Sequence, residues 1–371
     1  MLSFVICDNS IQLADDEAFT CDADIGGFPI SLGLIEIPPP KFDQNAEYKH
    51  YVLVKKRAFS CNYRDINIIS HFQKRCQHSS SDTVKFYSGF GSDFVAEVVS
   101  IGNQVSSLAV GQRVIPNPNY PYNKAAKIRG GIFSNAASMR YEIFHESQLL
   151  ALPDDISDEI AAAMSVCSIT AFSMIRRLNL SGNERILITG GTSNTSLAIL
   201  SLLREDYPDI SIVVLTTGVH AKEIELYGVR VIPTQSFFEN PDWRNDHTCS
   251  EGFDVVIDSF TDIYLPKIID YMAFESKYIT CGIYRQSPEI HQEIIAGCNW
   301  NELAYKLIRM NISLIGNCLG KTSDLVEALH KVANNERLIK IDSVYSGRSL
   351  SEFIDRAFNS RDRFGKVVYV Y

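Results

Sequence analysis

The sequence has no closely spaced pair of cysteines, and this absence removes the usual signature of a zinc-binding lobe or a redox dithiol. Its nine cysteines are scattered, and several lie in apolar runs such as the one that ends at Cys281. Disulfide-stabilised domains belong to oxidising compartments, whereas proteins of a reducing compartment keep their cysteines as thiols. We therefore expect buried free thiols and a cytoplasmic protein.

Basic clusters and long apolar runs are also missing. The 371 residues include 35 Lys and Arg against 44 Asp and Glu, a net charge of −9, so the basic surface that nucleic-acid binding requires is not expected. No stretch approaches the roughly 20 consecutive apolar residues of a membrane helix. The N-terminus turns acidic without the basic start of a signal peptide. These absences predict no nucleic-acid partner and no membrane association.

The spacing of apolar residues along the chain changes near Pro153. Before it, short apolar runs are separated by Gly, Pro, Asn and Asp, no long segment of helical period interrupts them, and the proline-rich stretch 116–123 predicts an exposed loop. After it, a helix is expected from Asp158 to about Leu178, followed by alternating strands and helices. The expected strands are 184–189, 211–215, 229–232, 254–258 and 277–281, with helices at 197–203 and 221–227.

This alternation predicts an α/β fold with a β-rich domain and a Rossmann domain. Continuous Val/Ile/Leu strands joined by helices form doubly wound parallel sheets that are buried on both faces. We assign residues 1–155 to the β-rich domain and residues 156–310 to the Rossmann nucleotide-binding domain. Residues 311–371 are expected to supply the last Rossmann strand and to return the chain to the first domain.

The first strand of the alternation leads into a turn that resembles a phosphate-binding loop. Such a loop needs a tight turn, close approach of the backbone to the pyrophosphate, and free amides at a helix N-terminus. Gly190 and Gly191 suit the tight turn, while Ser193 and Ser196 stand where the GxGxxG pattern has its other glycines. Capping of the following helix by Ser193 or Thr192 is the alternative interpretation. The candidate cofactor-binding residues here are Gly190, Gly191, Thr192, Ser193, Asn194, Thr195 and Ser196.

The end of the second strand of the alternation bears on which cofactor is used. An acidic residue there would bind the ribose 2′-hydroxyl of NAD. This chain instead has Thr216 and Thr217, followed by Lys222 at the start of the next helix. Hydroxyls and a cation suit a 2′-phosphate, which favours NADPH; a solvated Lys222 without a ligand is the alternative.

Several segments, taken together and in order, resemble one known family. They are Ser60–Asp65, Gly91–Gly102, Val110–Val114, Gly130–Asn135, Leu149–Pro153 and Phe364–Val368. Together they resemble the zinc-lacking quinone oxidoreductase and enoyl reductase branch of the medium-chain dehydrogenase/reductase superfamily. The resemblance covers roughly residues 50–371, whereas the first 45 or so residues match poorly. It implies a GroES-like β domain into which a Rossmann domain is inserted.

The resemblance also bears on zinc. The positions that match the metal ligands of zinc-using relatives hold Asn62, Ser92 and Asp93. A catalytic zinc needs three protein ligands, and Asn and Ser are poor ones. Cys61 is adjacent, but a shift of one residue would redirect its side chain, and residues 115–130 contain no cysteine for a structural zinc. We therefore expect no zinc.

Without a metal, hydride transfer needs an acceptor that is activated by conjugation, such as an enone, an enoyl thioester or a quinone. Asn62 matches the residue that borders the nicotinamide in relatives, and the adjacent Tyr63 could donate a proton. An aromatic side chain packed in the interdomain cleft is the alternative for Tyr63, and a structural role in the turn is expected for Asp65. Cys167, His71 and His145 are expected to be structural.

The leading hypothesis is therefore a zinc-independent, NADPH-dependent reductase of an activated C=C bond or quinone, with a small-molecule substrate. Its divergence suggests a tailoring enzyme of a biosynthetic pathway. One alternative is a zinc-free carbonyl reductase or alcohol dehydrogenase. Another is a family member that has lost redox function and acts as a binding or scaffold subunit, because the glycine pattern is degenerate. A homodimer through the last Rossmann strand, near Ser313–Gly316, is also expected from the resemblance.

Overall fold

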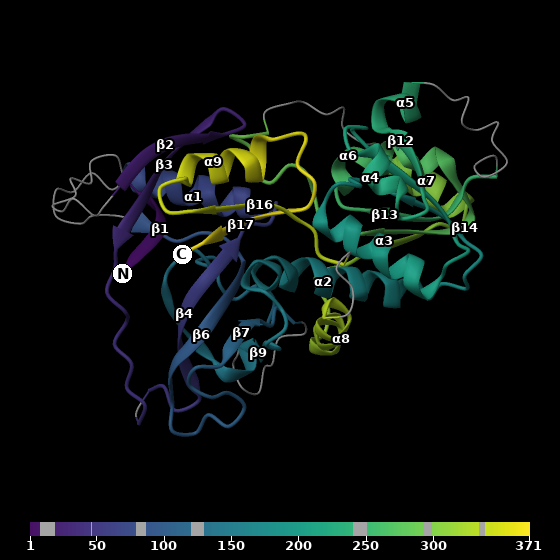
Figure 1. Ribbon diagram of the computed structural model, residues 1–371. Coiled ribbons are helices and arrows are strands. Elements are labelled where there is room, and N and C mark those ends of the chain that lie inside the picture. The colour runs from purple at the N-terminus through teal and green to yellow at the C-terminus, as the bar shows by residue number, and fades with distance from the viewer. Residues whose placement is uncertain are drawn as a thin grey trace.

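The computed structural model describes residues 1–7, 19–45, 47–78, 87–119, 130–239, 251–291, 299–333 and 338–371. These residues form two lobes, one rich in β-strands and one built on a parallel sheet (Figure 1). Both ends of the chain lie in the β-rich lobe. This arrangement confirms the predicted α/β fold in which the chain leaves the first domain and returns to it.

Two sheets make up the β-rich lobe. A small antiparallel sheet has the order β2-β3-β1-β5, and a larger one has the order β16-β17-β4-β6-β7-β9 with β8 paired to β4. The strands of the small sheet are β1 (Leu2–Cys7), β2 (Phe19–Ile25), β3 (Phe28–Glu36) and β5 (Tyr87–Ser88). Those of the larger sheet are β4 (Tyr51–Ser60), β6 (Asp93–Ile101), β7 (Arg113–Pro116), β8 (Tyr141–His145), β9 (Leu149–Ala151), β16 (Ile341–Ser346) and β17 (Lys366–Val370).

The N-terminal residues belong to the core of this lobe although their sequence matches relatives poorly. Phe4 on β1 is fully buried and its ring packs edge-on against Phe90, 4.8 Å between centroids, and against Phe59 of β4 at 5.9 Å. Such aromatic contacts add to the stabilisation from apolar burial. The small sheet is therefore part of the same folding unit as the larger one.

One helix in this lobe was not predicted: α1 (Asp65–His78) interrupts a region that was expected to be free of helices. Its inward face holds Ile66, Ile69, Gln73 and Cys76, which have the spacing of one helix face. The buried polar Gln73 accepts a hydrogen bond from the Ser31 amide at 2.9 Å. Since two of the four inward positions are not strongly apolar, the helical period was concealed in the sequence.

The second lobe is a six-stranded parallel sheet with helices packed against it. Its strand order is β12-β11-β10-β13-β14-β15. Strands β10 to β12 follow one another toward one edge of the sheet and β13 to β15 toward the other, so the strand order reverses between β10 and β13. The strands are β10 (Arg185–Ile188), β11 (Ser211–Thr216), β12 (Arg230–Pro233), β13 (Phe253–Asp258), β14 (Met272–Thr280) and β15 (Ser313–Gly316). The helices are α3 (Asn194–Asp206), α4 (Ala221–Glu225), α5 (Thr234–Glu239), α6 (Thr261–Ile268) and α7 (Trp300–Arg309). The five predicted strands correspond to β10–β14. Ligands bind to sheets of this kind beyond the carboxyl ends of the strands, at the point where the strand order reverses.

Helix α2 (Asp158–Leu178) runs between the lobes and has the predicted bounds (Figure 1). The Ser157 hydroxyl caps its first turn by accepting from the Ile160 amide, and acidic residues begin it while Arg176 and Arg177 end it, as the helix dipole favours. By length and composition alone this helix could cross a membrane, although the sequence was not expected to contain such a segment. Its most apolar part is 72% buried, as in a core helix of a globular protein.

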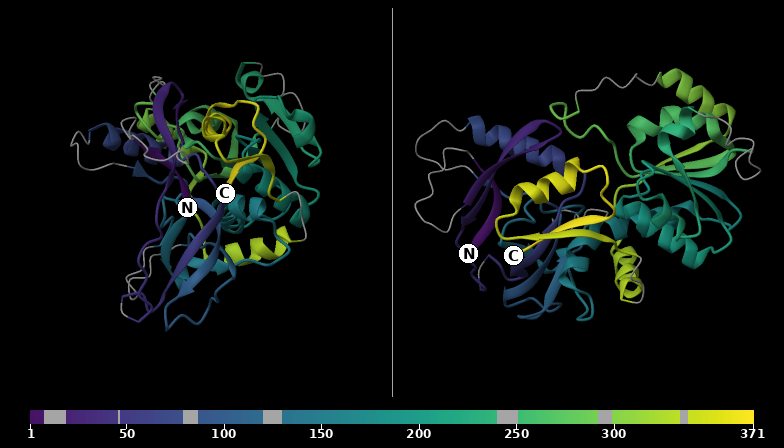
Figure 2. Two further views of the ribbon diagram at one scale, coloured as in Figure 1. Left: turned by 60° about the vertical axis from the view of Figure 1, so that its left-hand side comes forward. Right: turned by 45° about the horizontal axis from the view of Figure 1, so that its top comes forward.

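The last segment returns the chain to the β-rich lobe. After α8 (Thr322–Val332), β16 and β17 pair in parallel, α9 (Leu350–Ile354) lies between them in sequence, and β17 pairs with β4 (Figure 2).

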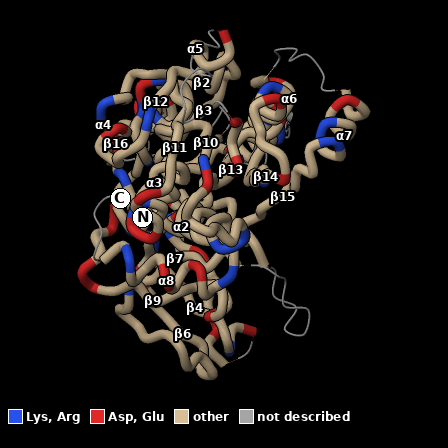
Figure 3. The backbone as a smooth tube through the Cα atoms, turned by 90° about the vertical axis from the view of Figure 1, so that its right-hand side faces the viewer, with Lys and Arg blue, Asp and Glu red and all other residues tan. Residues whose placement is uncertain are grey.

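Cysteines at 7, 21, 61, 76, 167, 281 and 318 are thiols rather than disulfides, and Cys318 is exposed; Cys249 and Cys298 lie outside the described residues. Of the expected loop 116–123, positions 120–123 lie outside the described residues. The backbone trace in Figure 3 shows that acidic and basic residues both occur along each of the two lobes.

Candidate functional site

The turn between β10 and α3 has the backbone that a phosphate-binding loop requires. Gly190 has a φ of +59°, which favours glycine, and a Cβ added there would meet no atom within 4 Å. A Cβ added to Gly191 would lie 2.3 Å from Val214 Cγ1 on the neighbouring strand. The first glycine therefore leaves room for a ligand in front of the turn, and the second allows the turn to approach β11.

The two serines that replace glycines in this turn form a chain of hydrogen bonds. Ser193 is the N-cap of α3 and accepts from the Ser196 amide at 3.2 Å, and its hydroxyl contacts the Ser196 hydroxyl at 2.9 Å. The Ser196 hydroxyl donates to the Thr189 carbonyl at 3.0 Å. The capping interpretation of Ser193 is therefore correct, and the same residue lies in the turn. Small hydroxyl side chains keep the helix close to the strand here.

The remaining predicted residues of the turn differ in their exposure. Thr192 is half-buried, and its carbonyl accepts from the Gly365 amide at 3.0 Å, which links the turn to the start of β17. Thr195 is half-buried in the first turn of α3. The Asn194 side chain points inward: its amide nitrogen donates to the Ala163 carbonyl at 3.3 Å, and its oxygen accepts from the Lys340 amide at 3.1 Å. Asn194 thus fastens the turn to α2.

The second predicted group lies at the end of β11. Thr216 is buried, whereas Thr217 and, on α4, Lys222 are exposed. Between them lies His220, which was not singled out in the sequence: its ring stacks on Phe364 at 4.9 Å, and Nε2 lies 2.6 Å from the Asp362 carbonyl oxygen. The C-terminal segment therefore touches both turns at the edge of the parallel sheet.

These features fit a dinucleotide. Gly190 leaves open space, the α3 N-terminus presents backbone amides and the positive end of the helix dipole, and Thr217 is exposed one strand away. The carboxyl edge is rigid, because buried Asp258 at the end of β13 accepts from the Thr189 hydroxyl at 2.5 Å and from the Tyr278 hydroxyl at 2.6 Å. Burial raises the pKa of the Asp258 carboxyl.

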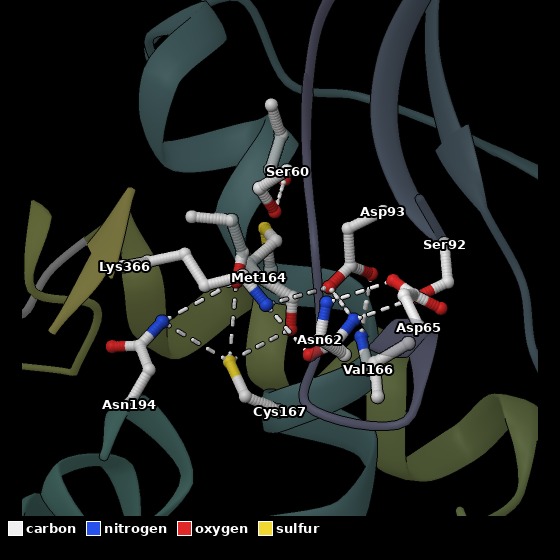
Figure 4. A network of polar contacts seen from close by, with 12 residues as sticks. Ser60, Asn62, Asp65, Ser92, Asp93, Met164, Val166, Cys167, Asn194 and Lys366 are labelled. Atoms are coloured by element: carbon white, nitrogen blue, oxygen red, sulfur yellow. Dashed lines mark hydrogen bonds and ion pairs between the residues drawn. The ribbon is translucent and has the colours of Figure 1, made fainter. Parts of the chain in front are cut away.

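A buried polar cluster lies where the sequence placed the matched metal-ligand positions (Figure 4). The amide nitrogen of Asn62 donates to the Ser92 hydroxyl at 2.9 Å and to Asp93 Oδ2 at 2.8 Å. Lys366 Nζ donates to Asn62 Oδ1 at 2.6 Å and forms an ion pair with Asp93 Oδ2 at 3.4 Å. The Lys366 side chain is only 6% exposed and that of Asp93 is fully buried. We call Asn62, Ser92, Asp93 and Lys366 the Lys366 cluster.

Two further groups border the Lys366 cluster. The Asp65 carboxylate accepts hydrogen bonds from the backbone amide of Asn62 and from the Ser92 hydroxyl, and burial raises the pKa of this carboxyl. These contacts agree with the structural role expected for Asp65. Cys167 on α2 interacts electrostatically with Lys366 and Asp93, and burial raises its thiol pKa to about 12. Cys167 was expected to be structural, and in the fold Asn194 donates to its sulfur at 3.4 Å while its thiol donates to the Ala163 carbonyl at 3.3 Å.

The donor set of the Lys366 cluster does not fit a divalent metal. Asn62 uses both of its amide protons and its oxygen within the cluster, and the Ser92 hydroxyl is committed to Asp65. Lys366 adds a positive charge without a lone pair to donate.

Tyr63 lies in an aromatic cage that both lobes build. Its ring packs against Phe260 at 4.8 Å and stacks on Tyr284 at 5.6 Å, and its hydroxyl lies 2.8 Å from His291 Nε2. Burial, followed by the neighbouring Tyr284, raises the pKa of the Tyr63 phenol. Both interpretations of Tyr63 thus have a structural basis: the ring is packed in the cleft, and the hydroxyl has a polar partner.

Comparisons with known proteins agree with this architecture. A family model described as "Alcohol dehydrogenase GroES-like domain" matches residues 48–154. Acryloyl-coenzyme A reductase of Metallosphaera sedula is 22% identical over 337 residues, which span 85% of this chain and 91% of that protein. Among solved structures, an NAD-dependent alcohol dehydrogenase has a TM-score of 0.72 at 17% identity, with all of both chains covered. The CurK enoyl reductase has a TM-score of 0.69 at 16% identity, with 99% of each chain covered.

Proposed function

Because the chain belongs to the medium-chain dehydrogenase/reductase superfamily, whose members are oxidoreductases that bind a nicotinamide cofactor, we propose that it is a zinc-independent reductase that uses NADPH. Its substrate would carry a C=C bond conjugated to a carbonyl group, as in an enone or enoyl thioester, or would be a quinone. The relative named acryloyl-coenzyme A reductase supports the thioester class.

The turn between β10 and α3 would hold the cofactor. The N-terminal turn of α3 suits the pyrophosphate, and the open space at Gly190 allows the close approach. The exposed Thr217 hydroxyl and Lys222 ammonium suit a 2′-phosphate, which supports NADPH over NADH. When bound, the cofactor supplies a hydride.

The Lys366 cluster is the single observation that carries the zinc-free proposal. A metal at this place would polarise the substrate oxygen as a Lewis acid. Here a buried ammonium provides the positive charge instead. Among the described residues it donates hydrogen bonds to Asn62 and Asp93, which occupy two of its three protons. Fixed charges and dipoles in a dry site stabilise negative charge that develops on a substrate oxygen. Tyr63, next to Asn62, is the proposed proton donor.

Cofactor titration and a substrate panel test the proposal together. We expect NADPH to quench the intrinsic fluorescence at micromolar concentration and NADH to bind more weakly. Enones, enoyl thioesters and quinones should be reduced, and prolonged dialysis against a strong chelator should leave turnover unchanged. No NADPH binding would instead support the redox-inactive scaffold alternative. Turnover of simple aldehydes alone would support the carbonyl reductase alternative, and loss of activity with the chelator would overturn zinc independence.

We also propose a cytoplasmic homodimer. Within the described residues β15 is the edge strand of the parallel sheet, and Leu314 on it is 41% exposed, while Trp300 and Ile308 on α7 are 64% and 75% exposed. Unpaired edge strands and apolar patches favour association with another chain. Sedimentation of the wild type should show a dimer that Leu314→Asp converts to monomers.

A role in tailoring a biosynthetic product remains the proposed context, and a preference for enoyl thioesters over simple quinones would support it.

A further inference from the structure

A hydrogen bond joins the two lobes directly behind the proposed proton donor. Tyr63 precedes α1 in the β-rich lobe, and His291 ends the segment 281–291 that follows β14 in the parallel-sheet lobe. The distance from Tyr63 Oη to His291 Nε2 is 2.8 Å, within the range of a good hydrogen bond. The contact connects residues 228 positions apart, and the resemblance to known relatives assigned it no role.

The two ring nitrogens of His291 have different partners. Nδ1 lies 3.2 Å from the Ser287 carbonyl oxygen and 3.4 Å from the Ser287 amide nitrogen, while Nε2 faces Tyr63. An imidazole that carries a proton on Nε2 donates to the phenolic oxygen, while Nδ1 either accepts from the Ser287 amide or, if it is also protonated, donates to the Ser287 carbonyl. In that arrangement the phenolic proton of Tyr63 is free to point away from His291.

His291 is anchored independently of Tyr63. Glu289, two residues earlier, accepts a hydrogen bond from Lys74 of α1, and the Ser287 hydroxyl contacts Glu289 Oε2 at 2.6 Å. The Lys74 contact lowers the pKa of Glu289 to about 2, so this ion pair persists throughout the neutral range. The segment 287–291 therefore stays docked on the β-rich lobe when either member of the Tyr63–His291 pair is changed.

We propose that His291 is a positioning residue for Tyr63: it donates a hydrogen bond from Nε2 to the phenolic oxygen, directs the phenolic proton toward the substrate and stabilises the phenolate that remains. This inference rests on the reductase function proposed above. One carbon of the C=C bond gains the hydride, the O–H bond of Tyr63 breaks, and its proton bonds to the adjacent carbon. His291 then returns a proton to the phenolate and regains one from water. Hydride plus proton balances the reduction.

The pair also makes the proton donor depend on contact between the lobes. Tyr63 belongs to one lobe, and its hydrogen-bond partner and the rings of Phe260 and Tyr284 belong to the other. If the lobes separate, the phenol loses its partner and gains access to water. Proton donation is therefore confined to the closed arrangement, in which water is excluded from the reacting carbons.

Four variants test the inference. Tyr63→Phe should lower kcat on the order of 10²- to 10⁴-fold, as loss of a general acid does. His291→Phe should lower kcat about tenfold, the equivalent of one hydrogen bond, with the affinity for NADPH unchanged. His291→Gln, whose amide can still donate, should recover part of the loss, which a merely structural role of His291 would not predict. His71→Phe, at an exposed histidine of α1, is the matched control and should behave as the wild type.

A measurement on the protein without cofactor separates this inference from the proposed function. In ¹⁵N spectra of histidine-labelled protein, the Nε2 resonance of His291 should shift in Tyr63→Phe, while that of His71 should not. An unshifted resonance, or a kcat of His291→Phe equal to that of the wild type, would overturn the role of His291. Wild-type protein that binds no NADPH would overturn the reductase function itself, and this outcome is visible before any variant is made.

Discussion

The turn between β10 and α3 and the Lys366 cluster both depart from the patterns of relatives, but in different ways. In the turn, two glycines are replaced by Ser193 and Ser196, whose hydroxyls bond to one another and to the backbone. The shape of the turn is kept because Gly190 and Gly191, the positions that need glycine, are unchanged. In the cluster the residue types at the matched metal-ligand positions have changed, and Asn62 and Asp93, which stand there, contact the buried Lys366 ammonium. The shape of the turn is compatible with small side chains in place of glycine, whereas a buried charge in the cluster needs a nearby charge of opposite sign.

The largest expected effect comes from removing the positive charge of the cluster. Lys366→Met leaves the fully buried Asp93 carboxylate without its cation, and breaking a buried pair costs about 3–5 kcal/mol of folding free energy. Urea unfolding followed by circular dichroism measures the change. The double variant Asp93→Asn, Lys366→Met removes both charges and should regain much of the loss. Equal stability of the single and double variants would show that charge balance does not hold the cluster together.

The shape of the turn should be most sensitive at Gly191. Gly191→Ala places a methyl group 2.3 Å from Val214 Cγ1 in a buried strand, and overpacking of this kind costs about 1–3 kcal/mol. NADPH binding should weaken with it, because the turn moves away from β11. Adding Val214→Ala makes room for the methyl group, so the two substitutions should be coupled in a double-mutant cycle. Strictly additive effects on stability would contradict the steric explanation.

A smaller effect is expected at the serines. Ser193→Ala removes the cap of α3 and should cost about 1 kcal/mol, whereas Ser193→Gly should cost only about a few tenths, because glycine is tolerated at N-caps. Thermal unfolding distinguishes the two. We further expect Ser193→Gly to leave the affinity for NADPH unchanged, since the serine is accommodated in the turn. Tighter binding of this variant would mean that the serine hinders the cofactor.

The smallest effect concerns the thiol beside the cluster. Since burial raises the pKa of Cys167 to about 12, its thiolate fraction stays minute near neutral pH and rises only as the pH approaches that value. Iodoacetamide at pH 8 should therefore modify the exposed Cys318 and spare Cys167, which peptide mapping by mass spectrometry can show. Rapid modification of Cys167 in the folded protein would mean that the cluster contains a thiolate and could still hold a metal.

Local features of the fold followed from local sequence. The apolar runs that became β10, β11 and β13 and the helix from Asp158 to Leu178 have clear periods, so neighbouring residues suffice to define them. Helix α1 was missed because Gln73 and Cys76 lie on its buried face. The glycine pair and the serines were found for the same reason, since the whole turn lies within a few consecutive residues.

The parts of the candidate site that the sequence did not disclose are those assembled from distant segments. In the sequence, Lys366 is marked only by its place in the segment Phe364–Val368, which resembles the family. Nothing near it in the chain indicates that it reaches Asn62. Cys167 and His291 likewise gain their partners from other elements. The chemistry of a side chain is fixed by its neighbours in space, so a lone lysine, cysteine or histidine in a sequence carries little information about its role.

The pairing of β17 with β4 has a consequence for how the protein is made. Val368 pairs with Ser60, so a strand at the very end of the chain completes a sheet that begins near its start. Contacts between such distant segments form slowly, and until they form the edge of β4 is open to pairing with other chains. During translation the edge of β4 stays unpaired until β17 has been synthesised and has left the ribosome. A nascent chain therefore depends on β17 both to close this edge and to bring Lys366 to Asn62.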